Sequence, residues 1–506
     1  MSAKLTEEDK CHLATGYLPS VEEANAIRTR NMKRGKLIRG INKEIATLRA
    51  RRRRLIAAST IGKAIMAPIR KIPVEILAEI LFQCIPLFTP DLMHEKEHLH
   101  PQNVCKLIGS VCREWRTIVN ETPRLWSSLF INCGTRAVED LYPLLKKSKS
   151  HPLEILIDSW SQSSVRPMPG LSTDVIAMLR GEMWRIRTLI AHMRREGGFF
   201  PPGSSLHAPL MQSFTHSSVE DHDMDLGEVY CPELRSVTLC RSDNIVRVLT
   251  ANPMQSVRHL QISSEAPPAL HLQFLNSLPH LVSLRFGHFG AEQPLEAPLA
   301  VALHSLKSLC VDAPKSTAQL LPHLHTPALE SFVLFCSNGF ETPSMEEIIE
   351  IICRGGVVKL RRLHLIQGTF RTLVPMMLCK LDHLDTLIIS KALMSGHLLT
   401  ALKVPDQDFG ILCPKLTTLV MIDTEVPQDP FDEFVHSRML ADSEEPAPGF
   451  VTCLKLHGRT REFYGDHHFQ RCSQTHSATI HITYDADPDL DPSEEYFPPT
   501  MWAEHN

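Results

Sequence analysis

A spaced apolar pattern recurs along most of the chain, and it limits the possible folds more than any other feature. One apolar residue is followed by a second three positions later and by a third two positions after that, as in Leu281, Leu284 and Phe286. Eleven full or partial copies begin between residues 186 and 451, each 23–35 residues after the previous one. Two apolar residues separated by one residue lie on the same face of an extended strand. The pattern therefore predicts a long series of short strands joined by return segments.

The distance between copies indicates the class of repeat. Strands of a sandwich or barrel recur about every 8–12 residues, whereas a period of about 20–29 residues is typical of leucine-rich repeats, with one strand and one helical or irregular return per turn. We therefore expect an α/β solenoid over residues 150–460, whose stacked repeats share a continuous core. The positions where a regular repeat carries Asn or Cys hold Ser242, Glu265, Phe289, Pro314, Ser337, Gly368, Ala392 and Thr424. We expect the usual buried side-chain ladder to be missing and the curvature to be irregular.

Residues between the core positions of each strand should line the concave face of this solenoid. In the early repeats they are polar, as at Ser236, Thr238 and Gln261. In the late repeats they are apolar, and we interpret this strip as a substrate-binding surface formed by Val333, Phe335, Ile366, Ile388, Val420 and Ile422. A contiguous exposed apolar patch usually marks a binding site for a partner. The alternative is that a loop or the C-terminal tail packs over the strip.

Short amphipathic helices are predicted ahead of the repeats. Pro73 suits the first turn of a helix, and apolar residues recur behind it at helical spacing in IPVEILAEIL. A second helix is predicted over residues 103–119, and the segment TPRLWSSL places Leu125 and Trp126 where they can close over the pair. Three short helices in about 60 residues form only a small core. Such a module leaves apolar surface uncovered, which suits a partner site.

The three segments IPVEILAEIL, VCREW and TPRLWSSL, in this order, resemble an F-box in the form common among fungal F-box proteins. The resemblance covers residues 66–131, with a longer loop, LFTPDLMHEKEHLH, between the first two helices. It implies binding to a Skp-type adaptor and, through that adaptor, to a cullin-based ubiquitin ligase. The residues that it implies as adaptor-facing are Ile72, Pro73, Ile76, Leu77, Ile80, Val111 and Trp115. The alternative is that these helices are an ordinary part of the core of a larger domain.

Residues 1–65 form a basic segment. Twelve Lys or Arg and one acid, Glu44, lie between residues 28 and 54, which gives this stretch a net charge of +11. Ile38, Ile41, Ile45, Leu48 and Leu55 step by 3, 4, 3 and 7, the spacing of a short coiled-coil seam. We expect a helix of about 20–30 residues that pairs weakly or docks on the rest of the protein.

The arginine run RARRRR, residues 49–54, has more than one interpretation. It is either a solvated helix face or a nuclear-import or phosphate-contacting patch. No aromatic residue interleaves with these arginines, so a base-stacking surface is not indicated and binding to nucleic acid is not expected.

Catalytic chemistry is not predicted. The residues from His94 to His98 satisfy zinc-protease patterns, but they lie in a charged insert between prolines, so we expect no metal site. The cluster His467, His468, Cys472 and His476 is too irregular in spacing for one. We expect no cofactor and no enzyme activity.

The location follows from what the chain contains. The sequence contains no run of about 18 consecutive apolar residues, so we expect no membrane span. Its first residues lack the pattern of a signal peptide. Scattered cysteines without a CxxC pair suit the cytoplasm or the nucleus. Residues 461–506 form a C-terminal extension with an acidic, proline-containing end.

The combined hypothesis is a substrate receptor of a Skp–cullin–F-box ligase, which binds the adaptor through residues 66–131 and a target protein through the repeats. The alternatives are a ligase-independent interaction scaffold and a nucleic-acid-associated protein that uses the basic helix.

Overall fold

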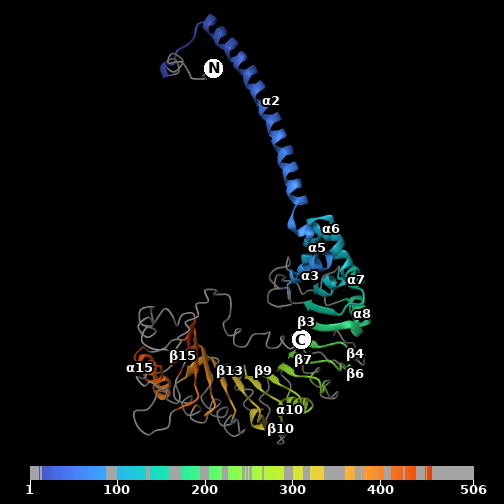
Figure 1. Ribbon diagram of the computed structural model, residues 1–506, viewed down its shortest axis with the longest axis vertical. Coiled ribbons are helices and arrows are strands. Elements are labelled where there is room, and N and C mark those ends of the chain that lie inside the picture. The colour runs from blue at the N-terminus through green and yellow to red at the C-terminus, as the bar shows by residue number, and fades with distance from the viewer. Residues whose placement is uncertain are drawn as a thin grey trace. The chain divides into compact units, whose positions relative to one another are not determined.

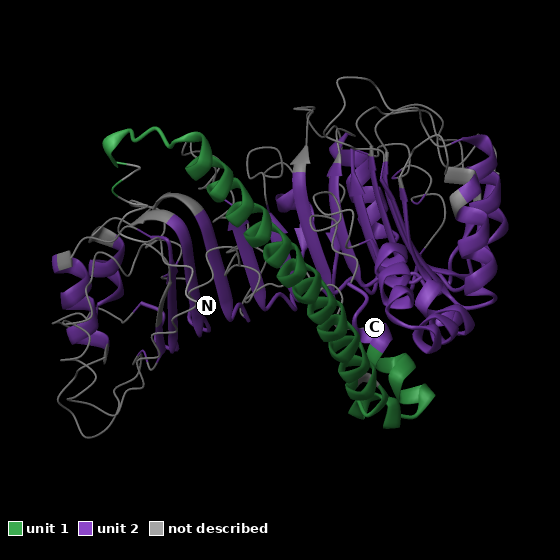
Figure 2. Cartoon of the chain, turned by 90° about the horizontal axis from the view of Figure 1, so that it is seen from above, with its two compact units in different colours: residues 1–80 green, residues 81–506 purple. Residues whose placement is uncertain are grey.

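The chain consists of two compact units, residues 1–80 and 81–506 (Figure 2). The computed structural model describes residues 11, 14–86, 100–132, 137–158, 172–193, 204–218, 226–241, 246, 249, 254–264, 267–289, 300–311, 320–335, 359–370, 378, 381–394, 396–403, 412–424, 428–439, 451 and 453–457. Within the described part of the chain, no helix combines the length and apolar character that crossing a bilayer requires.

The first unit is dominated by one long helix, α2, which runs from Val21 to Ile65 (Figure 1). It begins with a capping box: the Glu23 N–H donates to Ser20 Oγ at 3.4 Å, and the Ser20 N–H donates to Glu23 Oε2 at 2.8 Å. The expected length of 20–30 residues was wrong, since the helix has 45. A glycine costs a helix only about 1 kcal/mol, so neither Gly35 nor Gly40 ends it.

Two further elements follow α2 and lead into the second unit. The 3₁₀ helix η1 spans Pro68–Lys71, and the helix α3 spans Val74–Gln83. Ile72 stands between them with an extended backbone, and its N–H donates to the carbonyl of Ile69 at 3.3 Å. The Leu77 N–H donates to the carbonyl of Pro73 at 2.9 Å, so Pro73 starts α3 as the sequence predicts.

The second unit is built on one parallel sheet of 13 strands. The order of the strands across this sheet is their order along the chain, so each inner strand pairs with the one before it and the one after it. The strands are β1 (Ser128–Asn132), β2 (Leu153–Asp158), β3 (Ile186–Met193), β5 (Ser213–Ser218), β7 (Ser236–Cys240), β8 (His259–Ser264), β9 (Ser283–Phe289), β11 (Ser308–Val311), β13 (Ser331–Phe335), β14 (Arg362–Phe370), β15 (Thr386–Met394), β16 (Thr418–Ile422) and β17 (Cys453–His457). Two strand pairs lie outside this sheet: β4 (Ser204–His207) with β6 (Leu226–Tyr230), and β10 (Val301–Ala302) with β12 (Leu324–His325).

Helices and irregular segments return the chain from one strand to the next. Before β1 come α5 (Pro101–Val111), α6 (Arg113–Glu121) and η3 (Pro123–Trp126). The later ones are α7 (Ala137–Ser148), α8 (Thr173–Gly181), η4 (Met183–Arg185), α10 (Pro268–Asn276), η5 (Leu321–His323), α14 (Gly396–Leu402) and α15 (Gln428–Met439). This sequential parallel sheet with returns on one side is the expected leucine-rich-repeat type of solenoid, and the predicted fold class is confirmed.

The register of the sheet explains the repeat pattern. The second apolar position of each copy pairs with its equivalent in the next strand, as Leu284 does with Leu309 and Leu363 with Leu387. These side chains belong to one buried cluster that extends from Leu129 to Leu454. A fully buried leucine contributes about 1.5–3 kcal/mol, so the stacked rows stabilise strands that no single repeat could hold.

Two strands and one buried polar contact were missed from the sequence. The expected solenoid starts at residue 150, but β1 already belongs to the sheet, and Leu129 pairs with Ile155 of β2. At one of the expected ladder positions, Thr424 is buried and has its hydroxyl 3.0 Å from the carbonyls of both Ile389 and Ile422. A threonine hydroxyl here holds the turn after β16 to the neighbouring strand.

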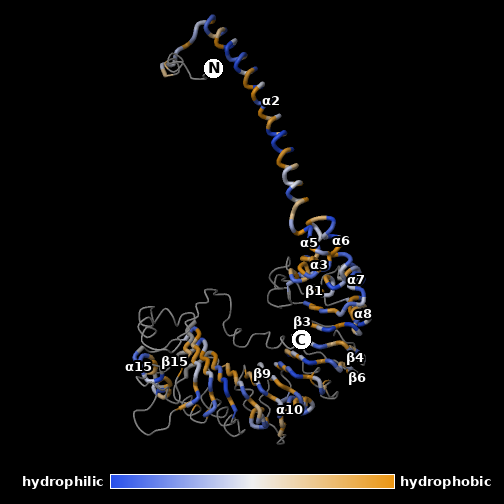
Figure 3. Tube along the Cα trace, viewed as in Figure 1, coloured by the Kyte–Doolittle hydropathy of each residue, from blue (hydrophilic) through white to orange (hydrophobic). Residues whose placement is uncertain are grey.

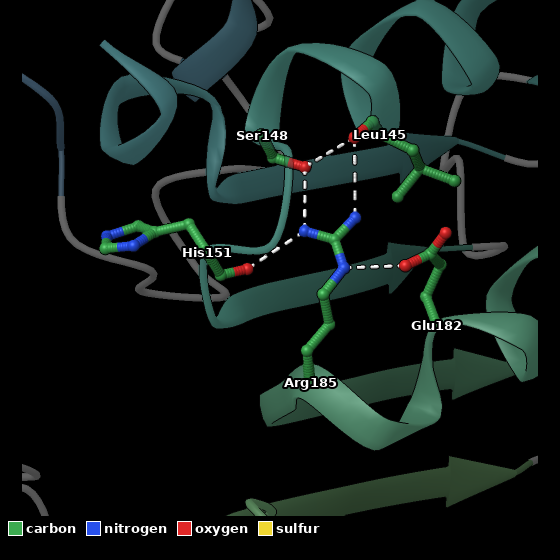
Figure 4. Close-up of polar contacts among 5 residues, drawn as sticks. All are labelled: Leu145, Ser148, His151, Glu182 and Arg185. Carbon is green, nitrogen blue, oxygen red and sulfur yellow. Dashed lines mark hydrogen bonds and ion pairs between the residues drawn. The ribbon is translucent and has the colours of Figure 1, made fainter.

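A buried arginine fixes the first return segments in place (Figure 4). Arg185 is 1% exposed, and its guanidinium donates to Ser148 Oγ at 3.0 Å, to the His151 carbonyl at 2.9 Å and to the Leu145 carbonyl at 3.4 Å. Its Nε donates to Glu182 Oε2 at 2.6 Å. The end of α7 and the turn before β3 are therefore held by one cation that makes four hydrogen bonds to protein acceptors.

Candidate functional site

The exposed face of α3 is the first candidate surface. Ile76 and Ile80 are one helical turn apart and are 55% and 42% exposed, and Val74 is also exposed. Pro73 is exposed and Ile72 is half-buried. Leu77, by contrast, is buried. In α3 the apolar residues therefore divide into an interior row and an exposed row, which an ordinary surface helix with a polar outer face does not show.

The helical region after residue 100 contains a break that the sequence did not predict. The single helix expected over residues 103–119 was wrong, because Cys112 has an extended backbone and separates α5 from α6. Its sulfur accepts from the Trp115 N–H at 3.4 Å, and Arg116 Nε donates to the Gly109 carbonyl at 3.0 Å. These two contacts satisfy backbone groups that the break leaves unpaired at the ends of the two helices.

The core beneath α5 and α6 is small but tightly connected. Trp126 is buried, and its Nε1 donates to the Val119 carbonyl at 2.7 Å. The thiol of Cys105 donates to the Leu125 carbonyl at 2.9 Å. Burial raises the pKa of this thiol to about 12, so it stays protonated and acts as a packed, inert group. The predicted closure of Leu125 and Trp126 over the helices is confirmed, since both are buried.

A second exposed apolar row lies on α5. Leu107 and Val111, one turn apart, are 67% and 61% exposed, while Val104 and Ile108 of the same helix are buried. Trp115 of α6 is half-buried. The spacing of Leu107 from Val111 is the same i, i+4 relation that joins Ile76 to Ile80. The signal in the sequence was the width of the apolar stripe on this helix, which is greater than the small core can cover and so predicts exposed apolar residues.

A glutamine joins α5 to the edge of the large sheet. Gln102 Nε2 donates to the Phe130 carbonyl at 2.7 Å, and its Oε1 accepts from the Phe130 N–H at 3.2 Å. The ring of His100 stacks on Phe130 with centroids 3.8 Å apart. In the second unit, α5 and the first strand of the repeats therefore form one connected body.

The second candidate surface is the face of the sheet that points away from the main core, which the sequence analysis expected to be concave. We call it the outer face of the sheet. Its middle part on β5–β9 is polar and half-buried, as at Thr238, Gln261 and Arg285. The predicted late strip follows on β13–β16, a part of the chain that Figure 3 shows largely in hydrophobic orange. Phe335 is half-buried, and its ring lies 5.7 Å from the guanidinium carbon of Arg285. These two residues mark the border between the polar and the apolar part.

The remaining residues of the late strip are buried. Val333 and Ile366 are 4% and 5% exposed and pack with Cys310, and Phe335 lies against them. Ile388, Val420 and Ile422 form another small cluster and are at most 1% exposed. The expected contiguous strip is therefore divided into two apolar groups, because Ile366 pairs with Ser390 and Ile388 pairs with His364 across β14 and β15. Both groups are covered in this conformation.

Metal chemistry has little support in the described residues. Among them, three or more His, Cys, Asp or Glu side chains nowhere gather closely enough to hold a metal ion. The segment His94–His98 and the cluster between His467 and His476 lie outside the described residues. Three other residues of types that can bind metal, His100, Cys105 and Cys112, lie close together in the sequence and are described. The thiol of Cys105 donates a hydrogen bond to the carbonyl of Leu125.

Comparison with known proteins agrees with this geometry. A helical module with exposed apolar rows is followed in the sequence by a sheet of stacked parallel repeats. The family model of F-box-like domains matches residues 69–132, from η1 to the end of β1. The chain therefore carries an F-box-like domain followed by a leucine-rich-repeat type of sheet. No curated protein matches this chain. An F-box domain implies binding to a Skp-type adaptor and is typical of non-catalytic adaptor proteins.

Proposed function

We propose that this protein is the substrate receptor of a Skp–cullin–F-box ubiquitin ligase. The observation that carries the proposal is the F-box-like match at residues 69–132, together with exposed apolar rows on the helices of that segment. The chain itself performs no chemistry in this proposal. It accelerates ubiquitin transfer by holding a target near the ligase, which raises the effective concentration of the reacting groups.

The adaptor contacts in this proposal are Pro73, Ile76 and Ile80 on α3, with Val111 and Trp115 on the following helices. Exposed isoleucines and valines gain about 25 cal/mol for each Å² of apolar surface that an adaptor buries. Ile72 is half-buried, so only the exposed part of its side chain can contact the adaptor. Leu77 is buried, so it supports the exposed row from within and does not itself offer a free surface.

Target recognition is assigned to the outer face of the sheet. Phe335 and the polar residues Thr238, Gln261 and Arg285 are partly exposed, so a target can reach them directly. Val333, Ile366, Ile388, Val420 and Ile422 remain in the proposed surface, but a target would contact them only after this face is uncovered. Cys11, Cys84, Cys105, Cys112, Cys231 and Cys453 are free thiols, which supports action in the reducing cytoplasm or nucleus.

The experiment is adaptor binding by the full-length protein with Ile76 changed to Asp. A carboxylate in a desolvated interface costs several kcal/mol, so we expect at least a hundredfold weaker binding to a Skp-type adaptor at about 1.4 kcal/mol per decade. Because Ile76 is 55% exposed, the fold should survive, with unchanged circular dichroism and melting. Purification with cullin and proteasome activity blocked would also recover the target.

The matched control is Ile61→Asp, the same change at an exposed residue of α2 outside the F-box-like segment. It should bind the adaptor like the wild type. The proposal would be contradicted if Ile76→Asp bound the adaptor as tightly as the wild type. It would also be contradicted if the wild type bound no Skp-type adaptor.

A further inference from the structure

The seam of α2 is exposed along its whole length. Its five residues, Ile38, Ile41, Ile45, Leu48 and Leu55, are 40–63% exposed. Each is fixed on one side of a continuous helix because steps of three and four residues return to the same face. A stripe of large aliphatic side chains in water is unfavourable, and a coiled-coil partner is the usual way in which such a stripe is buried.

Positive charge flanks this seam near its C-terminal end. Arg52 occupies the seam position between Leu48 and Leu55, and Arg49 and Arg51 occupy the positions that flank it. Figure 3 shows hydrophilic and hydrophobic residues interleaved along the helix. Within the helix, arginines three and four residues apart, such as Arg49 with Arg52 and Arg53, repel each other and reduce its stability.

A second copy of this chain is a poor partner. Each copy carries a net charge of +11 between residues 28 and 54, so pairing in either direction brings like charge together. In a parallel pair Arg52 faces Arg52 across the seam. Nucleic acid would satisfy the charge but would leave the isoleucines in water, and the helix offers no aromatic side chain for base stacking.

We propose that α2 binds an acidic amphipathic helix of another protein, which packs aliphatic residues on the seam and presents Asp or Glu to Arg49, Arg51 and Arg52. Such a partner is the one class that uses both the apolar stripe and the charge. It also relieves the repulsion among the arginines, so binding stabilises α2 itself. This interaction is independent of the adaptor, because it involves none of the F-box-like residues.

The test uses the full-length protein and a synthetic peptide of about four heptads with Ile or Leu at the seam positions and Glu at the flanking positions. Binding is measured by fluorescence anisotropy at about 0.15 M salt, where exposed charges more than about 8 Å apart are screened. Changing Ile41 and Ile45 to Ser should weaken binding at least about tenfold. Changing Arg49, Arg51 and Arg52 to Gln should weaken it about tenfold.

A charge-matched control separates the seam from net charge. Replacing Arg39, Lys43 and Arg54 by Gln also removes three charges, but on the far side of the helix, and should weaken binding less than about threefold. Equal losses in both charge variants would overturn the proposal. So would tighter binding of duplex DNA or phosphatidylserine vesicles that ignores the isoleucine changes, or a homodimer in sedimentation equilibrium that those changes abolish.

Discussion

Replacing Arg185 by Ala should destabilise the first repeats strongly. The side chain is 1% exposed and joins the end of α7 to the turn before β3 through Ser148, His151 and Glu182 (Figure 4). Alanine removes every one of these contacts and leaves the acceptors without their shared donor.

The size of the effect follows from the partners. Hydrogen bonds that involve a charged group contribute about 1.5–3 kcal/mol each, and removing one partner of a buried pair costs about 3–5 kcal/mol. Two factors lower the sum. The Leu145 carbonyl keeps a second donor, the Ser148 hydroxyl, at 2.9 Å, and the Glu182 side chain is 28% exposed and regains water. We expect a loss of about 3–5 kcal/mol in total.

Amide hydrogen exchange is the suitable assay because it reports local opening. Amides of β2 and β3 should exchange at least about a hundredfold faster in Arg185→Ala, at 1.4 kcal/mol per decade. The control is Arg187→Ala, an exposed arginine two residues further along, which should change stability by less than about 0.5 kcal/mol. Similar protection in the two variants would refute the assigned role of Arg185.

The remaining predictions concern the solenoid core. Burial, with a smaller effect of the His192 charge, lowers the pKa of His216 from 6.5 to about 4. The unfolded chain therefore binds the proton more readily, and stability falls by up to about 3 kcal/mol as the pH drops from about 6.5 to 4. His216→Leu should lose less stability than the wild type over that range in urea titrations, and parallel losses would contradict this. Leu363→Ala and Leu284→Ala, both at 0% exposure, should each cost about 2–5 kcal/mol. Melts indistinguishable from those of the exposed variant Arg361→Ala would show that these leucines are not core.

The sequence predicts the repeats well because the physics of a stacked sheet is local and periodic. Each copy of the pattern must bury the same positions to pair with its neighbours, so Leu284 and Leu309 reveal their register in the sequence. Strand β1 was missed although Trp126, Leu129 and Ile131 fit the same spacing. Trp126 was already assigned to closing over the helices, and the sequence does not separate these two roles. Strand β2 was missed because Pro152 stands where the first apolar residue of its copy would fall.

Other features depend on contacts that a pattern does not contain. The apolar period of residues 103–119 continues through Cys112, and the break there rests on hydrogen bonds from Arg116 and to the cysteine sulfur. The apolar strip on β13–β16 was predicted as a row, but what covers Ile388 and Val420 cannot be derived from the strands themselves. For α3, helical spacing grouped Leu77 with Ile76, and only packing separates the buried residue from the exposed one.

The contact between Gln102 and Phe130 gives the helix before the sheet a structural role at the edge of the sheet. A parallel sheet begins with a strand whose outer N–H and C=O groups are open to any other strand, and such an edge invites aggregation. The Gln102 amide occupies one such pair of groups on β1, donating to the carbonyl and accepting from the N–H as a neighbouring strand would. The helix α5 thus serves as the N-terminal cap that a repeat array requires to stay soluble. Removal of α5 from this chain would therefore also uncap the array behind it.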